Sequence, residues 1–158
     1  MLRRRLCAMF AVVAAALAVL TGCSVTIPTD PHGALDRIQG GVLRVGASPS
    51  VDLVTVDGDR VGGPLGDLVS GFAEAHDARV VWTIGSEEDL VDGLERGALD
   101  LAIGGMTERT PWSERVSVTR GYRGVPGGHG EPMVILLPLG ENRLQSALEQ
   151  YLDAQVPG

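Results

Sequence analysis

The stretch RVVWTIGSEEDLVDGLERGALDLAI, residues 79–103, contains the pattern that decides the fold. Residues 79–84 are rich in β-branched and aromatic side chains, which favour a strand. Ser86 begins a capping-box-like helix start, an amphipathic helix follows it, and Gly97 is a natural stop for that helix. Residues 99–103 are apolar again and predict a second strand. A strand, a helix and a strand in succession indicate neighbouring parallel strands in an α/β domain.

The same alternation continues on both sides of this stretch. Strands are expected over 42–46, 51–56 and 132–138, and helices are expected from Pro64 and over 141–153. The sequence therefore predicts a three-layer α/β fold, with a mostly parallel sheet and helices on both faces. In such sheets ligands bind at the carboxyl ends of the strands. That edge would be formed by three short loops, at residues 48–50, 85–86 and 104–107.

The N-terminus has the pattern of an exported lipoprotein. Arg3, Arg4 and Arg5 precede an unbroken apolar run over 8–20. A run of this length is too short to span a bilayer, which needs about 20 residues, but it suits the apolar region of a signal peptide. The run ends in Leu20-Thr21-Gly22-Cys23, which resembles a lipobox. The alternative is an ordinary secretory signal with a chance cysteine.

Several expectations follow from the lipobox. Residues 1–22 would be the signal peptide, and Cys23 would carry the lipid. The protein would then be held at the extracytoplasmic face of the cell membrane. Residues 23–41 are polar, contain two prolines and predict a tether, and 42–158 would form the domain. Cys7 leaves with the signal, so neither a disulfide nor a cysteine-based metal site is expected.

Composition limits the partners of the domain. The 13 basic residues are all arginines, and three of them precede Cys23, so the rest of the chain has 10 arginines against 20 acidic residues. An acidic domain is a poor candidate for binding nucleic acid or an anionic membrane surface, so the lipid alone would provide the anchor. The three histidines are scattered and suggest neither a metal site nor a catalytic base. No cofactor is expected.

Five motifs, in the same order, resemble one known family. The stretch from Leu43 to Tyr122 resembles the type 2 periplasmic binding proteins, specifically the family 3 extracellular solute-binding proteins of ABC importers. The motifs are LRVG at 43–46, GPLGDL at 63–68, LVDGLERGALD at 90–100, GGMT at 104–107 and VSVTRGY at 116–122. The resemblance implies the fold of lobe one of these proteins and a small polar solute such as an amino acid.

Two departures from the family pattern matter. The family inserts a second lobe after the tyrosine, whereas here only a connector follows, residues 121–131, with five glycines. Its Gly127–Gly130 part is expected to be flexible. Amino-acid-binding members also carry an arginine five residues after the threonine of the GGMT-like loop, which clamps the ligand carboxylate. Here Trp112 occupies that position.

The resemblance places candidate ligand-binding residues on the loop at residues 104–107 and beside it. Thr107 and the amides near Gly105 would hold a polar solute, unless they only form a turn. Arg109 or Arg115 would replace the missing clamp, unless they are ordinary surface arginines. Trp112 would stack on a ligand or, as we prefer, cover the edge where lobe two is absent. The expected set is Ser48, Gly105, Met106, Thr107, Arg109 and Trp112.

The leading hypothesis is a lipid-anchored, solute-binding-like protein linked to ABC-type uptake or sensing, with an ABC permease or other membrane protein as partner. Two copies would rebuild a cleft if they associated. The alternative is an accessory lipoprotein without a small ligand that contacts a membrane transporter or sensor. An enzyme is not expected. Ser48 and Ser50 have no His/Asp partners in a recognisable nucleophile pattern. Dehydratases and lyases of this fold need charged groups in a closed cleft.

Overall fold

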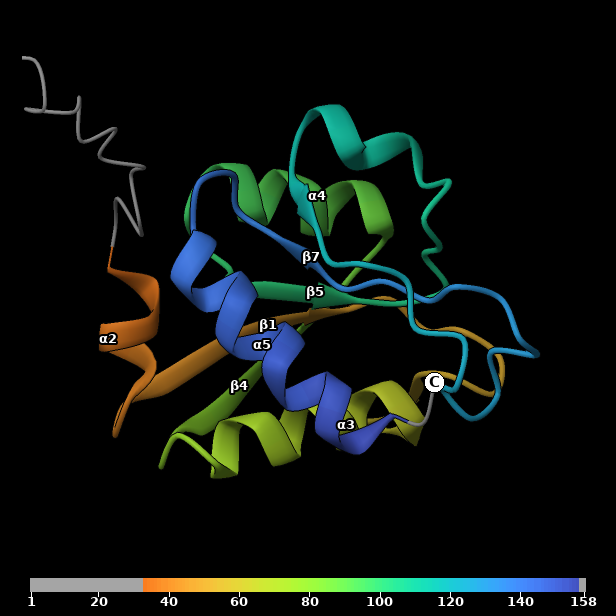
Figure 1. Cartoon of the computed structure of the whole chain (residues 1–158), viewed down its shortest axis with the longest axis horizontal. Helices are drawn as coiled ribbons and strands as arrows, with labels where there is room; N and C mark the ends of the chain where they lie inside the picture. The colour runs from red at the N-terminus through yellow and green to blue at the C-terminus, as the bar shows by residue number, and fades with distance from the viewer. Residues whose placement is uncertain (1–32, 157–158) are drawn as a thin grey trace, which may run out of the picture.

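A five-stranded sheet forms the middle layer of the domain (Figure 1). The computed structural model describes residues 33–156; the expected signal peptide, residues 1–22, and Cys23 lie outside the described residues. The strand order is β4-β1-β5-β7-β6. The strands are β1 (Val42–Ala47), β4 (Arg79–Ile84), β5 (Leu101–Ile103), β6 (Ser117–Val118) and β7 (Leu136–Leu137).

The sheet is mostly parallel, as the sequence predicted. β1 pairs in parallel with β4 on one side and with β5 on the other, so that Val45 lies between Trp82 and Leu101. β7 is the exception, because it runs antiparallel to both β5 and β6. Between β6 and β7 the chain passes through the connector 121–131 and forms no crossover helix, so the two strands join as antiparallel neighbours.

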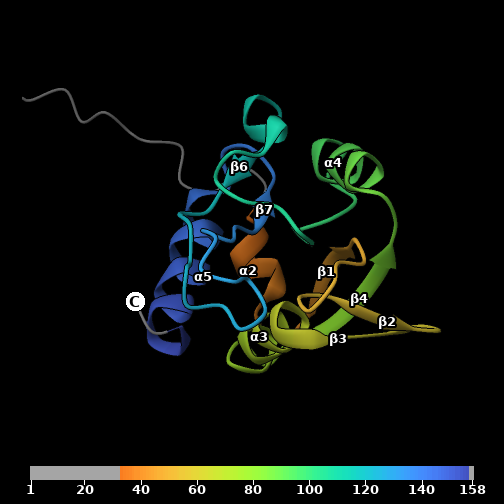
Figure 2. The same ribbon diagram turned by 90° about the vertical axis from the view of Figure 1, so that its right-hand side faces the viewer.

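Helices cover both faces of the sheet (Figure 2). Helices α2 (Ala34–Ile38), α3 (Gly63–Glu74) and α5 (Asn142–Gln155) pack on one face around a core that includes the fully buried Phe72. Helix α4 (Glu87–Glu95) covers the other face, where Leu90 and Leu94 pack with Val134. Ser86 caps α4, because its hydroxyl accepts the N–H of Asp89 at 3.2 Å. None of the helices within residues 33–156 has the length and apolar character needed to cross a bilayer.

Helix α2 corrects the expected boundary of the tether. It lies within the range 23–41, yet Ala34, Leu35 and Ile38 are buried in the main core. The folded domain therefore includes α2 as well as the residues from Val42 on. A helix of five residues is too short to show a helical period in the sequence, and only its packing reveals it.

Two expected strands are shorter than the sequence indicated. Of the range 51–56, only the end belongs to a strand, β2 (Thr55–Asp57). β2 forms a separate hairpin with β3 (Arg60–Gly62) rather than joining the sheet. Asp52 interrupts the range with a left-handed φ of 61°. Of 132–138, only β7 is a strand, although Met133 forms isolated bridges with Thr107 and Tyr122.

The connector 121–131 is packed rather than flexible, contrary to the expectation. Tyr122 and Val125 are buried in the main core, and Gly128 is buried as well. Gly127 has a φ of +80°, and a Cβ on this residue would lie 2.1 Å from the carbonyl oxygen of Asp52. The glycines of the connector therefore permit left-handed turns and allow its backbone to approach another loop closely.

Replacing Gly127 with alanine tests this packing, with Gly130→Ala as the matched control. Both glycines have a φ of +80°, but a Cβ on Gly130 would meet nothing within 4 Å. Both variants lose stability because alanine must adopt a left-handed conformation. Only Gly127→Ala also brings a Cβ too close to the carbonyl of Asp52. We expect Gly127→Ala to lower the free energy of unfolding by about 1–3 kcal/mol more than Gly130→Ala in urea titrations. Equal losses would contradict the close packing of the connector.

Candidate functional site

Two loops meet where β1 and β5 end. The backbone N–H of Ser48 donates to the carbonyl of Ile103 at 2.9 Å, so the loops leave the sheet side by side. A Cβ on Gly104 would lie 3.1 Å from the Cβ of Ser48, and one on Gly105 would lie 2.9 Å from Oγ of Ser50. Both serines therefore lie directly against a glycine backbone. We call Ser48, Ser50, Gly105 and Thr107 the strand-end site.

Thr107 is held by the turn that follows β5. Its Oγ1 accepts the N–H of Arg109 at 3.4 Å, and its carbonyl accepts the N–H of Thr110 at 2.9 Å. An isolated antiparallel β-bridge to Met133 also holds the backbone of Thr107. The hydroxyl can still donate its own hydrogen, which suits an anionic or carbonyl oxygen on a solute.

Arg109, but not Arg115, lies beside the strand-end site. The Arg109 side chain is 84% exposed, and its Nη2 lies 3.3 Å from Oε2 of Glu131 in the connector. Arg115 instead pairs with Asp92 at 2.7 Å and with Glu95, both on α4. Those bonds raise the pKa of the Arg115 guanidinium well above its usual value. Of the two candidate replacements for the clamp, only Arg109 is positioned to reach a solute.

The side chain of Met106 is buried, and that of Trp112 packs against α4. Met106 is 3% exposed and packs in the core beneath α4, so its side chain cannot contact a solute there. Trp112 lies on a short 3₁₀ helix, η1 (Pro111–Glu114), and packs against the same core. Its indole Nε1 donates to Oε2 of Glu87 at 3.1 Å, so the ring lies against the first turn of α4.

The connector contributes residues that the sequence did not identify. Glu131 reaches Arg109, and Nε2 of His129 lies 3.6 Å from Oδ2 of Asp52. A glycine-rich stretch gives no periodicity from which its contacts follow, so no local signal marked these residues. Ser50 did carry a signal, since it lies on a predicted strand-end loop. Within residues 33–156, no group of three His, Cys, Asp or Glu side chains is arranged to hold a metal.

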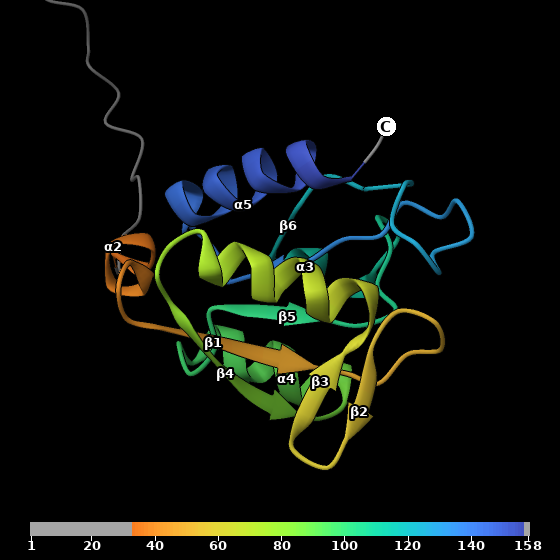
Figure 3. The ribbon, with the colours of Figure 1, turned by 90° about the horizontal axis from the view of Figure 1, so that it is seen from below.

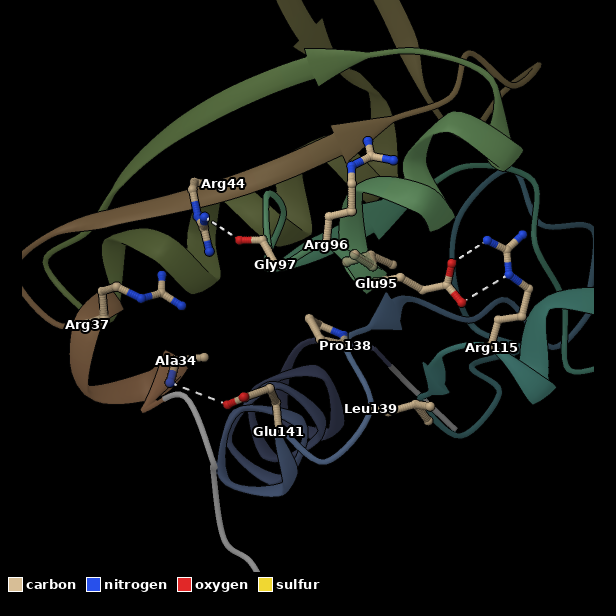
Figure 4. Close-up of a pocket in the computed structure, with 11 residues that line it drawn as sticks. Ala34, Arg37, Arg44, Glu95, Arg96, Gly97, Arg115, Pro138, Leu139 and Glu141 are labelled. Atoms are coloured by element: carbon tan, nitrogen blue, oxygen red, sulfur yellow. Dashed lines mark hydrogen bonds and ion pairs between the residues drawn. The ribbon is translucent and has the colours of Figure 1, made fainter.

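A cavity of about 660 Å³ lies at the opposite end of the sheet, beside α2 (Figure 4). Its walls include Arg37, Arg44, Arg96 and Arg115, together with Glu95 and Glu141. Arg44 donates to the carbonyl of Gly97 at 2.7 Å, and Glu141 accepts the N–H of Ala34 at 3.3 Å. These arginines are engaged by protein groups, and the cavity has acidic as well as basic walls.

The carboxylate of Asp100 pairs with two of the arginines that line this cavity. It is 1% exposed and accepts bonds from both guanidiniums, at 2.6 Å from Arg44 and 3.0 Å from Arg37. It also accepts the backbone N–H of Arg44 at 2.9 Å. The bond to Asp100 raises the pKa of Arg44 even though partial burial opposes the charge. The ion pairs of Asp100 with Arg37 and Arg44 thus join α2 to β1 and to the residue that precedes β5, and we interpret them as structural.

The comparisons with known proteins define the class of fold. No family model matches the sequence, and no curated protein matches it. Among solved structures, the chain is similar to a point mutant of the arginine-bound form of domain 1 from TmArgBP, with 23% identity and a TM-score of 0.66. The match covers 77% of this chain and 97% of that chain.

Two further structures agree on the fold. The unmutated arginine-bound domain 1 of TmArgBP is 21% identical with a TM-score of 0.64, and the match covers 75% of this chain and 97% of that one. The ancestral amino acid-binding protein AncCDT-1, a precursor of cyclohexadienyl dehydratase, is 14% identical with a TM-score of 0.62, over 77% and 92% of the two chains. The domain therefore has the fold of a single lobe of a periplasmic solute-binding protein.

Substituting Asp100 tests the structural interpretation of the arginine cavity. Asp100→Asn leaves two partly buried guanidiniums without their carboxylate, and we expect it to lower the free energy of unfolding by about 3 kcal/mol. Asp59→Asn, in the exposed hairpin turn, makes the same chemical change and should cost less than about 0.5 kcal/mol. Both variants are unfolded in urea, and equal decreases in their free energies of unfolding would refute this interpretation.

Proposed function

We propose that this chain is a single-lobed, lipid-anchored, extracytoplasmic solute-binding protein that takes a small polar solute such as an amino acid. The observation that carries the proposal is the convergence of Ser48, Ser50, Gly105 and Thr107 at the carboxyl ends of β1 and β5. This is the edge where ligands bind in open α/β sheets. Hydroxyl groups and an exposed glycine backbone provide hydrogen-bond partners there, and Arg109 provides a cation for a carboxylate.

The absence of a second lobe does not rule out solute binding. The similar domain 1 of TmArgBP is described as arginine-bound, and the match covers nearly the whole of that separate domain. We therefore place the site on the lobe itself. Uptake or sensing would then require a membrane partner such as an ABC permease, which would receive the solute from the exposed strand-end site.

The lipid anchor would lie at the other end of the domain. α2 is the first described helix, and it lies at the end of the sheet opposite the strand-end loops (Figure 3). The residues between Cys23 and α2 can span at most roughly 35 Å. Lipid on Cys23 would tether the domain by its α2 end and keep it within reach of a membrane partner.

An accessory lipoprotein is the second candidate, because of one exposed apolar side chain. Val51 follows Ser50 directly and is 86% exposed. An apolar group beside the site favours contact with a protein. A photo-crosslinker at position 51, used in intact cells, would capture a transporter or sensor if this candidate is correct. A single-lobed receptor that delivers solute would crosslink in a solute-dependent manner.

Substituting Thr107 tests solute binding directly. The full-length chain in mild detergent is titrated by calorimetry with L-arginine, L-citrulline, L-glutamine and L-glutamate. Thr107→Val loses a hydroxyl at the site, and we expect roughly tenfold weaker binding of the preferred amino acid. Thr83→Val, on the exposed edge strand β4, is the control and should bind normally. A wild-type chain that binds no member of the panel would contradict the amino-acid proposal and favour the accessory role.

The lipid anchor has its own test. Cells are labelled with a palmitate analogue, and membranes are separated from soluble protein. Cys23→Ser should abolish labelling and release the protein from the membrane fraction, because Cys23 is the proposed acceptor. Cys7→Ser, within the proposed signal, should leave labelling intact. Persistent labelling of Cys23→Ser would overturn the anchor.

A further inference from the structure

Strand β4 forms one edge of the central sheet, and its outer side is open. Within residues 33–156, β1 is the only strand that pairs with it. Figure 2 shows β4 at one margin of the sheet. The strand contains six residues with neither a proline nor a lysine, and it pairs with β1 over its whole length without a bulge. Proteins commonly protect a sheet edge with these features, so this edge lacks the usual protection against another strand.

The backbone groups of β4 alternate between the inner and the outer side of the strand. The N–H of Arg79 donates to the carbonyl of Gly41 at 2.9 Å, and the N–H of Gly85 donates to the carbonyl of Ala47 at 3.2 Å. Because alternate residues of a strand turn their N–H and C=O groups to the same side, the odd-numbered residues face β1. The even-numbered residues of 80–84 therefore present their N–H and C=O groups outward, where a further strand could pair with them.

Apolar side chains accompany these outward backbone groups. Val81 is 37% exposed and Ile84 is 42% exposed, and Thr83 between them is exposed as well. Trp82 is half-buried and packs against the main core. A neighbouring strand would cover these β-branched and aromatic side chains, which form favourable cross-strand pairs.

The two ends of β4 carry opposite charges. Arg79 begins the strand, is exposed and has no ion pair within residues 33–156. Glu87, Glu88 and Asp89 follow the other end of the strand and form the acidic first turn of α4. An antiparallel copy of the same strand would set the basic end of each strand beside the acidic end of the other. The edge is thus complementary to itself in charge, as a two-fold interface requires.

We propose that two copies of this chain pair through β4, antiparallel across a two-fold axis, so that their two sheets become one. The outward groups fix the register, because only one register uses all of them. In that register Trp82 pairs with Trp82 of the second copy, and Val80 pairs with Ile84 of the second copy. Between these pairs Val81 lies opposite Thr83 of the second copy, in the closely spaced position without hydrogen bonds.

The opposite edge of the sheet limits the assembly to two copies. β6 has only two residues, and the carbonyl of Val118 already accepts Nε2 of Gln145 at 3.1 Å. Pairing through β4 is therefore closed and does not continue into a fibre. Antiparallel pairing also sends the two strand-end sites toward opposite ends, so this dimer does not rebuild a cleft between them. The inference goes beyond the proposed function and does not depend on solute binding.

Sedimentation of the full-length chain in a density-matched mild detergent measures the assembly. The wild-type chain should have twice the protein mass of one copy. Thr83→Lys sets a cation diagonally beside Arg79 of the second copy, twice in the dimer, and should weaken self-association roughly tenfold. Thr55→Lys makes the same change at an exposed position of β2, in the separate hairpin, and should leave the mass doubled. Circular dichroism checks that both variants fold.

Charge reversal tests the complementarity of the two ends. Arg79→Glu would set acidic groups against the acidic turn of the second copy and should weaken self-association. Adding Glu88→Arg to this variant should restore most of the loss, because the opposite charges then face each other again. Arg60→Glu, at an exposed position of β3, is the control and should change nothing.

Disulfide crosslinking tests the register. Differently tagged Val81→Cys and Thr83→Cys chains are co-expressed, and their membranes are oxidised with copper phenanthroline. The two chains should crosslink to each other, whereas wild-type chains, which contain only Cys7 and Cys23, should not. The pairing is wrong if the wild-type chain sediments as a monomer, or if Thr83→Lys leaves its mass doubled. It is also wrong if the mixed crosslink does not form, or if Val81→Cys captures a different protein in its place.

Discussion

The pairing of β1 with β4 on one side and β5 on the other is the constraint on which the rest of the structure depends. All three strands are parallel, so their carboxyl ends lie at one edge. The register sets Ala47 opposite Ile103, and the loops of Ser48 and Gly104 therefore start together. Gly104 and Gly105 then allow the two serines to lie against the backbone. The strand-end site is a direct consequence of this register.

The connector imposes the second constraint. The chain returns from β6 to β7 without a crossover helix, and β7 runs antiparallel to β6. This return carries Met133 past both Tyr122 and Thr107 and lays the connector along the strand-end loops. The connection that takes the place of a second lobe thus also supplies a surface beside the site.

Much of the fold could be predicted from periodicity, and much of the site could not. β1, β4, α3, α4 and α5 follow from apolar spacing, capping and glycine stops, all of which are local signals. Thr107 and Ser48 follow from their places at strand ends. The burial of the Met106 side chain could not be predicted, because sequence alone does not give the direction in which the backbone turn sends it. Helix α2 and Glu131 depend on contacts between segments about a hundred or about twenty residues apart, for which a single sequence contains no signal.

The two ends of the sheet have different chemistry. At the α2 end, Asp100 binds Arg37 and Arg44 and fixes the first described helix to the sheet. At the other end, the charged pairs are exposed. Because exposed pairs contribute little to stability, these residues can serve recognition without cost to the fold. The core thus separates an ionic cluster around a buried carboxylate at one end of the sheet from exposed ion pairs at the other.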